Sequence, residues 1–196
     1  MKRISEIMMK LIASDVCGKE INFVNLHLSD DDLQQLYTLS KKHDLAHLVG
    51  DALIRHKLLP YGEIRTKFEK QMMTAVYRYE RINYELNNLS ETLNQADIPF
   101  IPLKGSVLRQ YYPEPRMRTS CDIDILVHDA DLDRAVILLT EQLEYRAESE
   151  QSHDIGMYSP GGVHLELHYT LIESNVVGKA DEVLKAVWEQ SLPGQE

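Results

Sequence analysis

The sequence has few cysteines and no long hydrophobic run, and each of these features argues against one class of protein. Two cysteines, Cys17 and Cys121, occur among 196 residues, too few for the disulfide framework typical of small secreted domains. No apolar segment approaches the ~20 residues that a membrane-spanning helix needs. The start at Met1 leads into a charged amphipathic stretch, not into a signal-peptide core. We therefore expect a cytoplasmic protein that does not associate with membranes.

Basic residues are also scarce relative to acidic ones. Lysine and arginine number 21 against 31 aspartates and glutamates, giving a formal net charge of −10. Nonspecific binding to DNA or to an anionic membrane needs a net basic surface, so long nucleic acid is disfavoured as a partner. One segment departs from this trend, because residues 104–118 contain four bases and one acid. Such an island is typical either of a site for a small anionic ligand or of an ordinary solvated patch.

Hydrophobic periodicity divides the chain into a helical first part and a mixed second part. Ser29, followed by three aspartates, is a good helix start, with a break expected near His43-Asp44. After Asp97, strands are predicted over 98–103, 121–127, 145–148, 155–159 and 163–168, with helices over 107–112, 129–143 and 181–190. The pattern predicts an α+β fold with a helical N-terminal region over 1–96 and a small mixed-sheet α/β domain over 97–196.

A single long amphipathic helix is predicted within residues 63–96. Apolar residues from Ile64 to Leu93 recur at spacings of three or four, as one face of a helix requires. Such a helix can pack across its own domain, or it can offer a surface to a protein partner.

Two aspartates interrupt a strand that otherwise reads as buried. Alternate strand residues point the same way, ~7 Å apart, so Asp122 and Asp124 share one face. Two buried carboxylates this close repel each other. A divalent cation such as Mg²⁺ removes the repulsion, because oxygen ligands at this spacing can converge on it. The alternative is an exposed strand end without a ligand, since Asp-x-Asp pairs are common there.

A later strand supplies a third candidate ligand. Residues 163–168 alternate, which places His164, Glu166 and His168 on one face and leucines on the other. Glu166 is the additional carboxylate. A zinc site built on the two histidines is geometrically poor, because they lie ~13 Å apart on an extended strand. For His164 we expect ordinary surface alternation.

Lys104-Gly105-Ser106 lies between a predicted strand and a predicted helix. Glycine lets the backbone approach a phosphate closely, and a helix start directs N–H groups toward the anion. Serine adds a hydroxyl donor. The segment lacks both the Walker pattern and a Gly-x-Gly-x-x-Gly pattern, and Gly-Ser alone is common in loops.

Taken in order, these motifs resemble the DNA polymerase β-like nucleotidyltransferase superfamily and, more narrowly, the uncharacterised nucleotidyltransferase family. The resemblance covers about Ile98 to Tyr169 through "LKGSVLRQYYPEPRMRTSCDIDILV" and "HLELHY". The family pattern has a Lys-Gly turn, a Tyr-Pro loop and an arginine four residues before the first aspartate. The residues on matching positions include Arg118, Asp122, Asp124 and His168. The earlier segment "KKHDLAHLV", with His43 and His47, agrees in character.

The resemblance implies a nucleotidyltransferase-like α/β domain and a two-metal mechanism. The catalytic carboxylates that would hold Mg²⁺ or Mn²⁺ are Asp122, Asp124 and Glu166. The residues that would bind the phosphates of an NTP such as ATP are Lys104, Gly105, Ser106 and Arg118. His168 would support the metal ligands from beside them. Relatives tend to continue with further helices after the region of Trp188, so we expect a short member of the family or a fragment.

Three functions follow from these observations. The first is an enzyme that moves a nucleoside monophosphate from an NTP to a hydroxyl of an unidentified acceptor. The second is a non-catalytic nucleotide-binding regulatory module. The third is a helical scaffold whose α/β part is structural and whose Asp-x-Asp pair is incidental.

Overall fold

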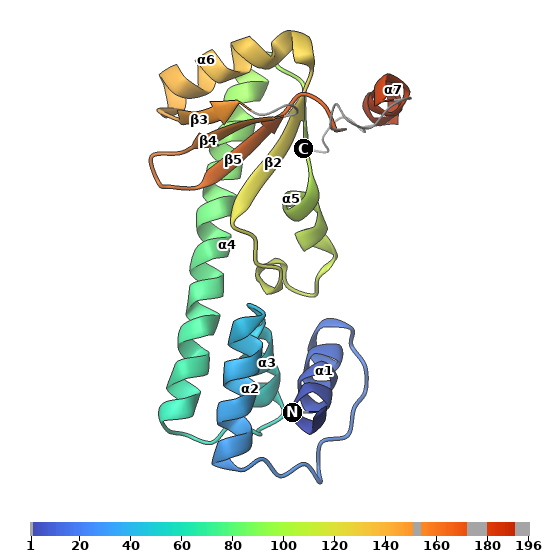
Figure 1. Cartoon of the computed structure of the whole chain (residues 1–196), viewed down its shortest axis with the longest axis vertical. Helices are drawn as coiled ribbons and strands as arrows, with labels where there is room; N and C mark the ends of the chain where they lie inside the picture. Colours follow the sequence, from blue (N-terminus) through green and yellow to red (C-terminus); the bar gives the residue numbers. More distant parts are fainter. Residues whose placement is uncertain (1, 151–153, 172–179, 191–196) are drawn as a thin grey trace. The chain divides into compact units, whose positions relative to one another are not determined.

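A computed structural model of the chain describes residues 2–150, 154–171 and 180–190 (Figure 1). Four helices come first: α1 (Lys2–Val16), α2 (Asp30–Lys42), α3 (Ala46–Arg55) and α4 (Glu63–Gln95). The later elements are β1 (Phe100–Pro102), α5 (Lys104–Leu108), β2 (Asp122–Val127), α6 (Leu132–Leu143), β3 (Arg146–Glu150), β4 (Asp154–Tyr158), β5 (His164–His168) and α7 (Ala180–Gln190). Short 3-10 turns are η1 (Arg109–Tyr111), η2 (Pro115–Met117) and η3 (Asp129–Asp131). The predicted α+β class is confirmed.

The chain forms two compact units. Unit 1 comprises residues 1–79 and 109–119, and unit 2 comprises residues 80–108 and 120–196. Helix α4 contributes residues to both units. The predicted domain boundary after residue 96 falls inside unit 2, just after the C-terminal end of α4. The division into domains at this residue stays a prediction. No described helix combines the length and hydropathy that crossing a membrane requires.

The core of unit 1 forms where the apolar faces of its helices meet. Its buried side chains include Leu11, Leu33, Leu36, Leu53 and Phe68. Helix α2 begins as the sequence predicts, because the Ser29 hydroxyl accepts from the Asp32 N–H and the Asp32 carboxylate accepts from the Ser29 N–H. The break after α2 is also confirmed, with Asp44 at φ +54°.

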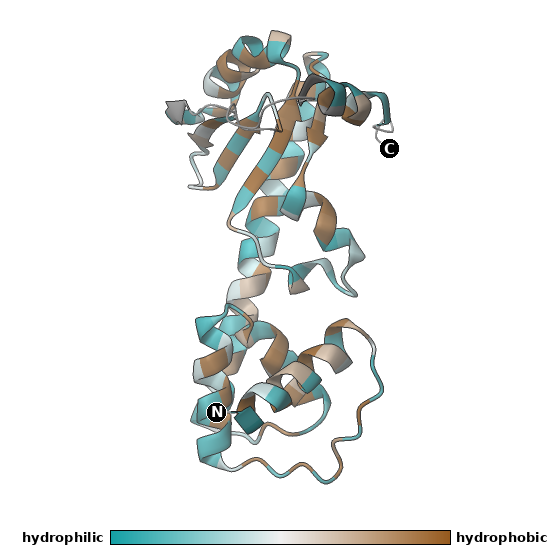
Figure 2. Cartoon of the chain, turned by 45° about the vertical axis from the view of Figure 1, so that its right-hand side comes forward, coloured by the Kyte–Doolittle hydropathy of each residue, from teal (hydrophilic) through white to brown (hydrophobic). Residues whose placement is uncertain are grey.

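Unit 2 is built on a five-stranded sheet with the order β1-β2-β5-β4-β3. Strands β2 and β5 are parallel, while the other neighbours are antiparallel. Hydrophobic and hydrophilic residues alternate along the strands in Figure 2. The apolar side chains of β2 and β5 pack against the second half of α4 and against α6, in a core that includes Leu89, Leu93, Ile123, Ile125, Leu139, Leu165 and Leu167. The opposite face of these two strands carries their polar residues.

Helix α4 confirms the long amphipathic helix predicted within residues 63–96. Three of its large apolar side chains, Met73, Tyr77 and Tyr84, are more than half exposed. Their spacing of four and seven residues puts them on one face of the helix. The use of α4 as a surface for a protein partner stays a prediction.

Candidate metal and nucleotide site

The parallel pairing of β2 with β5 sets Asp124 beside Glu166. In this register Asp122 lies opposite His164, and Asp124 lies opposite Glu166. Because alternate strand residues share a face, both carboxylates project from the face opposite the buried core. Two acidic residues that are 42 positions apart in the sequence thus become direct neighbours in the sheet.

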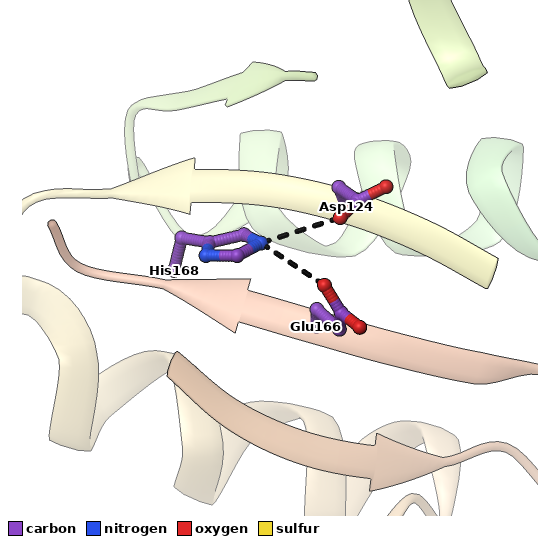
Figure 3. Close-up of side chains that lie close together, drawn as sticks. All are labelled: Asp124, Glu166 and His168. Atoms are coloured by element: carbon purple, nitrogen blue, oxygen red, sulfur yellow. Dashed lines mark hydrogen bonds and ion pairs between the residues drawn. The ribbon is translucent and has the colours of Figure 1, made fainter. Parts of the chain in front are cut away.

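Asp124, Glu166 and His168 form a compact group in which the three side chains point toward one another (Figure 3). One ligand atom from each lies within 4.8 Å of the others. His168 Nε2 is 3.3 Å from Asp124 Oδ1 and 3.4 Å from Glu166 Oε2. Asp124 and His168 are buried, whereas Glu166 is partly exposed. Within the described part of the chain, no other group of three or more His, Cys, Asp or Glu side chains has ligand atoms this close together.

The positively charged Lys104 side chain contacts both carboxylates of this group. Its Nζ donates to Asp124 Oδ1 at 2.5 Å and to Glu166 Oε2 at 3.3 Å. The Leu103 N–H donates to the Asp124 carbonyl at 2.9 Å, which fixes the chain beside β2 just before Lys104. Lys104 itself has φ +44°, in the left-handed region. That conformation costs a non-glycine residue on the order of 1 kcal/mol, so Lys104 is held under strain where it reaches the carboxylates.

The donors around Asp124 keep its carboxyl group ionised. Burial alone would raise the pKa of Asp124, but hydrogen bonds from His168 and Lys104 outweigh burial and hold that pKa well below its usual range. The hydrogen bond with Asp124 in turn raises the pKa of Lys104, against the opposing effect of partial burial. At neutral pH the site therefore contains a buried carboxylate and an ammonium group.

The donor set fits a divalent cation. Adjacent ligands of an octahedral ion at ~2.1 Å lie ~3.0 Å apart. The separations of 3.3 Å and 3.4 Å between His168 Nε2 and the two carboxylate oxygens are close to this value. Small side-chain adjustments would bring the three atoms onto one ion. His168, predicted as a support for the metal ligands, is thus also a candidate ligand.

Asp122 and His164 lie at the start of the two parallel strands. Asp122 shares the face of Asp124, as predicted, but it is not a member of the three-residue group. His164 packs its ring against Tyr158, with 4.8 Å between the ring centroids. This contact agrees with ordinary surface alternation at His164. The role of Asp122 as a metal ligand stays a prediction.

Gly105 and Ser106 lie inside the first turn of α5, because this helix begins at Lys104 and not at Val107 as predicted. The N–H groups of the first residues of a helix have no intrahelical partner, so glycine and serine are tolerated there. Helix α5 is five residues long, so its dipole is weak. The Ser106 hydroxyl is buried and has no hydrogen-bond partner among the described residues. A buried, unpaired hydroxyl costs about 1–3 kcal/mol, and a ligand oxygen would satisfy it.

Arg118 lies in the segment of residues 109–119 that packs with the helices of unit 1. Buried His47 places Nε2 3.0 Å from the Met117 carbonyl, and the Thr119 hydroxyl donates to Asp44 at 3.0 Å. These two contacts fix the residues on either side of Arg118. Its Nε is buried without a hydrogen-bond partner among the described residues. The phosphate-binding role of Arg118 stays a prediction.

The contact of Lys104 with both carboxylates and the direct approach of His168 were not predicted from the sequence. The alternation of residues 163–168 placed Glu166 and His168 on one face, which was the available signal for His168. The strand register that brings them to Asp124 depends on pairing between distant segments. No local pattern indicates that register.

The mixed sheet, in which adjacent parallel strands bring carboxylates together, is consistent with an α+β nucleotidyltransferase-like fold, the fold class that the family match supports. A family model described as "Uncharacterised nucleotidyltransferase" matches residues 29–195. The chain belongs to this family, and membership supports nucleotidyl transfer as its general activity. Comparison with curated proteins and with solved structures gave no match.

Proposed function

We propose that the protein transfers a nucleoside monophosphate from an NTP to a hydroxyl group of an acceptor, with Mg²⁺ or Mn²⁺ as cofactor. The observation that carries this proposal is the convergence of Asp124, Glu166 and His168 in a member of a nucleotidyltransferase family. The same face of β2 offers Asp122 as a further carboxylate. Two carboxylates from adjacent strands, together with Asp122, supply the oxygen ligands that a two-metal site requires.

The reaction is a substitution at phosphorus. The acceptor oxygen forms a bond to the α-phosphorus, the bond to the β-phosphate oxygen breaks, and pyrophosphate leaves. Metal ions held by Asp122, Asp124 and Glu166 would neutralise charge on the triphosphate. Glu166 has a partly exposed side chain, so it is accessible to an acceptor hydroxyl and can take its proton.

Phosphate binding falls to the segment around α5. The buried Ser106 hydroxyl would donate to a phosphate oxygen, and Gly105 would let the backbone approach it. Lys104 would supply positive charge from the same segment, and phosphate binding by Arg118 stays a separate prediction. The net charge of −10 favours a small molecule or a protein side chain as acceptor over long nucleic acid.

The test follows the label of an NTP. ATP labelled on the α-phosphate is incubated with the protein, Mn²⁺ and pools of candidate acceptors, beside ATP labelled on the γ-phosphate. We expect the α-label to enter a product and the γ-label to appear as pyrophosphate. Asp124→Asn should abolish both signals, while the exposed acid variant Glu141→Gln should retain them.

Other outcomes separate the remaining functions. Metal-dependent binding of the analogue with the α–β bridging oxygen replaced by a methylene group, without any turnover of ATP, would favour the nucleotide-binding module. Indifference to every NTP, together with unchanged behaviour of Asp124→Asn, would favour the helical scaffold.

A further inference from the structure

We propose that Lys104 is an exchangeable counter-ion, whose ammonium group neutralises Asp124 and Glu166 until a divalent cation displaces it toward the nucleotide phosphates. This inference rests on the proposed function and assigns Lys104 two successive partners. It goes beyond a fixed phosphate contact, because it makes metal binding and nucleotide binding depend on the same side chain.

The ammonium group and a metal ion need the same oxygen atoms. Lys104 Nζ contacts Asp124 Oδ1 at 2.5 Å and Glu166 Oε2 at 3.3 Å. These are also the two oxygens that lie 3.3 Å and 3.4 Å from His168 Nε2. A divalent cation coordinated by these three side chains would therefore take oxygens that the ammonium group already holds. Like charges at such short range repel strongly, so one cation must leave.

The Lys104 ammonium group can leave the carboxylates at a low cost in free energy. Its side chain is 60% exposed, whereas that of Asp124 is 3% exposed. A flexible four-carbon stem can therefore swing into solvent without opening the core. The backbone remains anchored, because the Leu103 N–H stays bonded to the Asp124 carbonyl on β2.

The backbone of Lys104 is strained. The φ of +44° is a conformation that glycine adopts freely and lysine does not. The backbone conformation does not favour lysine at this position, so a reason for lysine here lies in its side chain. Strained residues of this kind are typical of functional sites.

The destination of the ammonium group follows from the chain order. Lys104 directly precedes Gly105 and the buried, unpaired Ser106 hydroxyl, which are the proposed phosphate contacts. A metal ion that arrives alone must displace the ammonium group without giving it a new partner. A metal ion that arrives with a triphosphate supplies that partner. Lys104 should therefore weaken binding of the metal alone and strengthen binding of the metal–nucleotide complex.

The experiment measures Mn²⁺ binding from the electron paramagnetic resonance signal of free Mn²⁺. Wild type is compared with Lys104→Met, which keeps the stem, and with Lys104→Arg, which keeps the charge. Lys104→Met should bind Mn²⁺ about tenfold more tightly, within the usual range of coupling between sites, and Lys104→Arg should resemble wild type. Lys104→Gly, which also relieves the strain at φ, serves as a second neutral variant should Lys104→Met fail to fold.

A second titration uses Mn²⁺ with an ATP analogue that has a methylene bridge between the α- and β-phosphorus atoms. Here Lys104→Met should bind about tenfold more weakly than wild type, the opposite sign to the first titration. Equal or weaker binding of Mn²⁺ alone by Lys104→Met would overturn the inference. In that case, binding by wild type that is lost in Asp124→Asn would leave the proposed metal site standing. Absence of Mn²⁺ binding in wild type and in all folded variants would overturn both proposals.

Discussion

Asp15 in unit 1 and Asp124 in unit 2 are almost equally buried, with side chains 0% and 3% exposed. Their pKa values nevertheless shift in opposite directions. Burial raises the pKa of Asp15 by more than the charge of Arg55 lowers it. Hydrogen bonds from His168 and Lys104 outweigh burial at Asp124 and keep its pKa low. Burial alone therefore does not decide the ionisation of a carboxyl group in this molecule.

The difference lies in the donors that face each carboxylate. Arg55 Nε lies 3.1 Å from Asp15, but neither Asp15 oxygen has a hydrogen-bond partner among the described residues. At Asp124, by contrast, Lys104 donates directly and His168 Nε2 lies nearby. A convergence of donors around a buried carboxylate is a feature of functional sites. This contrast supports the proposed site at Asp124, whereas no such set of donors surrounds Asp15 among the described residues.

The largest expected effect is on turnover. Glu166→Gln keeps the size of the side chain but removes the proton acceptor, so pyrophosphate release from the NTP should fall by about 10²–10⁴-fold. The matched control is Glu141→Gln, an exposed acid on α6 of the same unit. Unchanged release by Glu166→Gln would remove Glu166 from the chemistry.

Loss of the charge at Asp124 should lower stability at neutral pH. Asp124→Asn removes charge-assisted hydrogen bonds, and since Lys104 is mostly exposed we expect a loss of about 1–2 kcal/mol in the free energy of unfolding. The folded pKa of Asp124 lies below its usual value, so this contribution is fully present above that usual value and is lost as pH falls from there through the folded pKa. Urea unfolding at several pH values measures it. A stability difference independent of pH would contradict the assignment.

Removal of the charge at Asp15 should change the free energy of unfolding in the opposite direction. Because the folded pKa of Asp15 is raised, Asp15 ionises at a lower pH in the unfolded chain than in the folded chain. Wild type therefore loses stability as pH rises from the unfolded pKa through the folded pKa. Asp15→Asn should therefore be more stable than wild type at neutral pH, by about 1 kcal/mol. The same urea series checks both aspartates. A destabilised Asp15→Asn variant would show that the pair with Arg55 outweighs burial.

The smallest expected effect concerns the choice of metal. A nitrogen ligand suits transition metals better than Mg²⁺, which prefers oxygen. We therefore expect wild type to bind Mn²⁺ more tightly than Mg²⁺, and His168→Gln to reduce this preference several-fold. Calorimetric titration with each ion provides the comparison. An unchanged preference would mean that His168 supports the carboxylates without contacting the ion.

Local patterns predict much of this fold. The capping residues Ser29 and Asp32 mark the start of α2, and the apolar periodicity from Ile64 to Leu93 identifies α4. Alternation within β2 and β5 assigns each polar residue to a face. These features depend on neighbours in sequence, so they can be read without the structure.

The remaining features depend on contacts between distant segments. The register that sets Asp124 beside Glu166 joins strands separated by more than 35 residues. The reach of Lys104 into the site requires a left-handed backbone at a lysine, which sequence preference argues against. The packing of residues 109–119 with the helices of unit 1 includes the contact between His47 and Met117, which are 70 positions apart.

In the proposed site, these carboxylates hold a metal ion together with a nucleotide. Thermal unfolding of wild type and of the Asp122→Asn/Asp124→Asn double variant, with each NTP in the presence and absence of Mg²⁺ or Mn²⁺, tests it most directly. Ligand at ~100 times its Kd should stabilise wild type by about 2.7 kcal/mol. We expect a shift in the unfolding temperature that requires both metal and nucleotide and that vanishes in the double variant. A shift of equal size in the double variant, or no shift with any NTP, would contradict it.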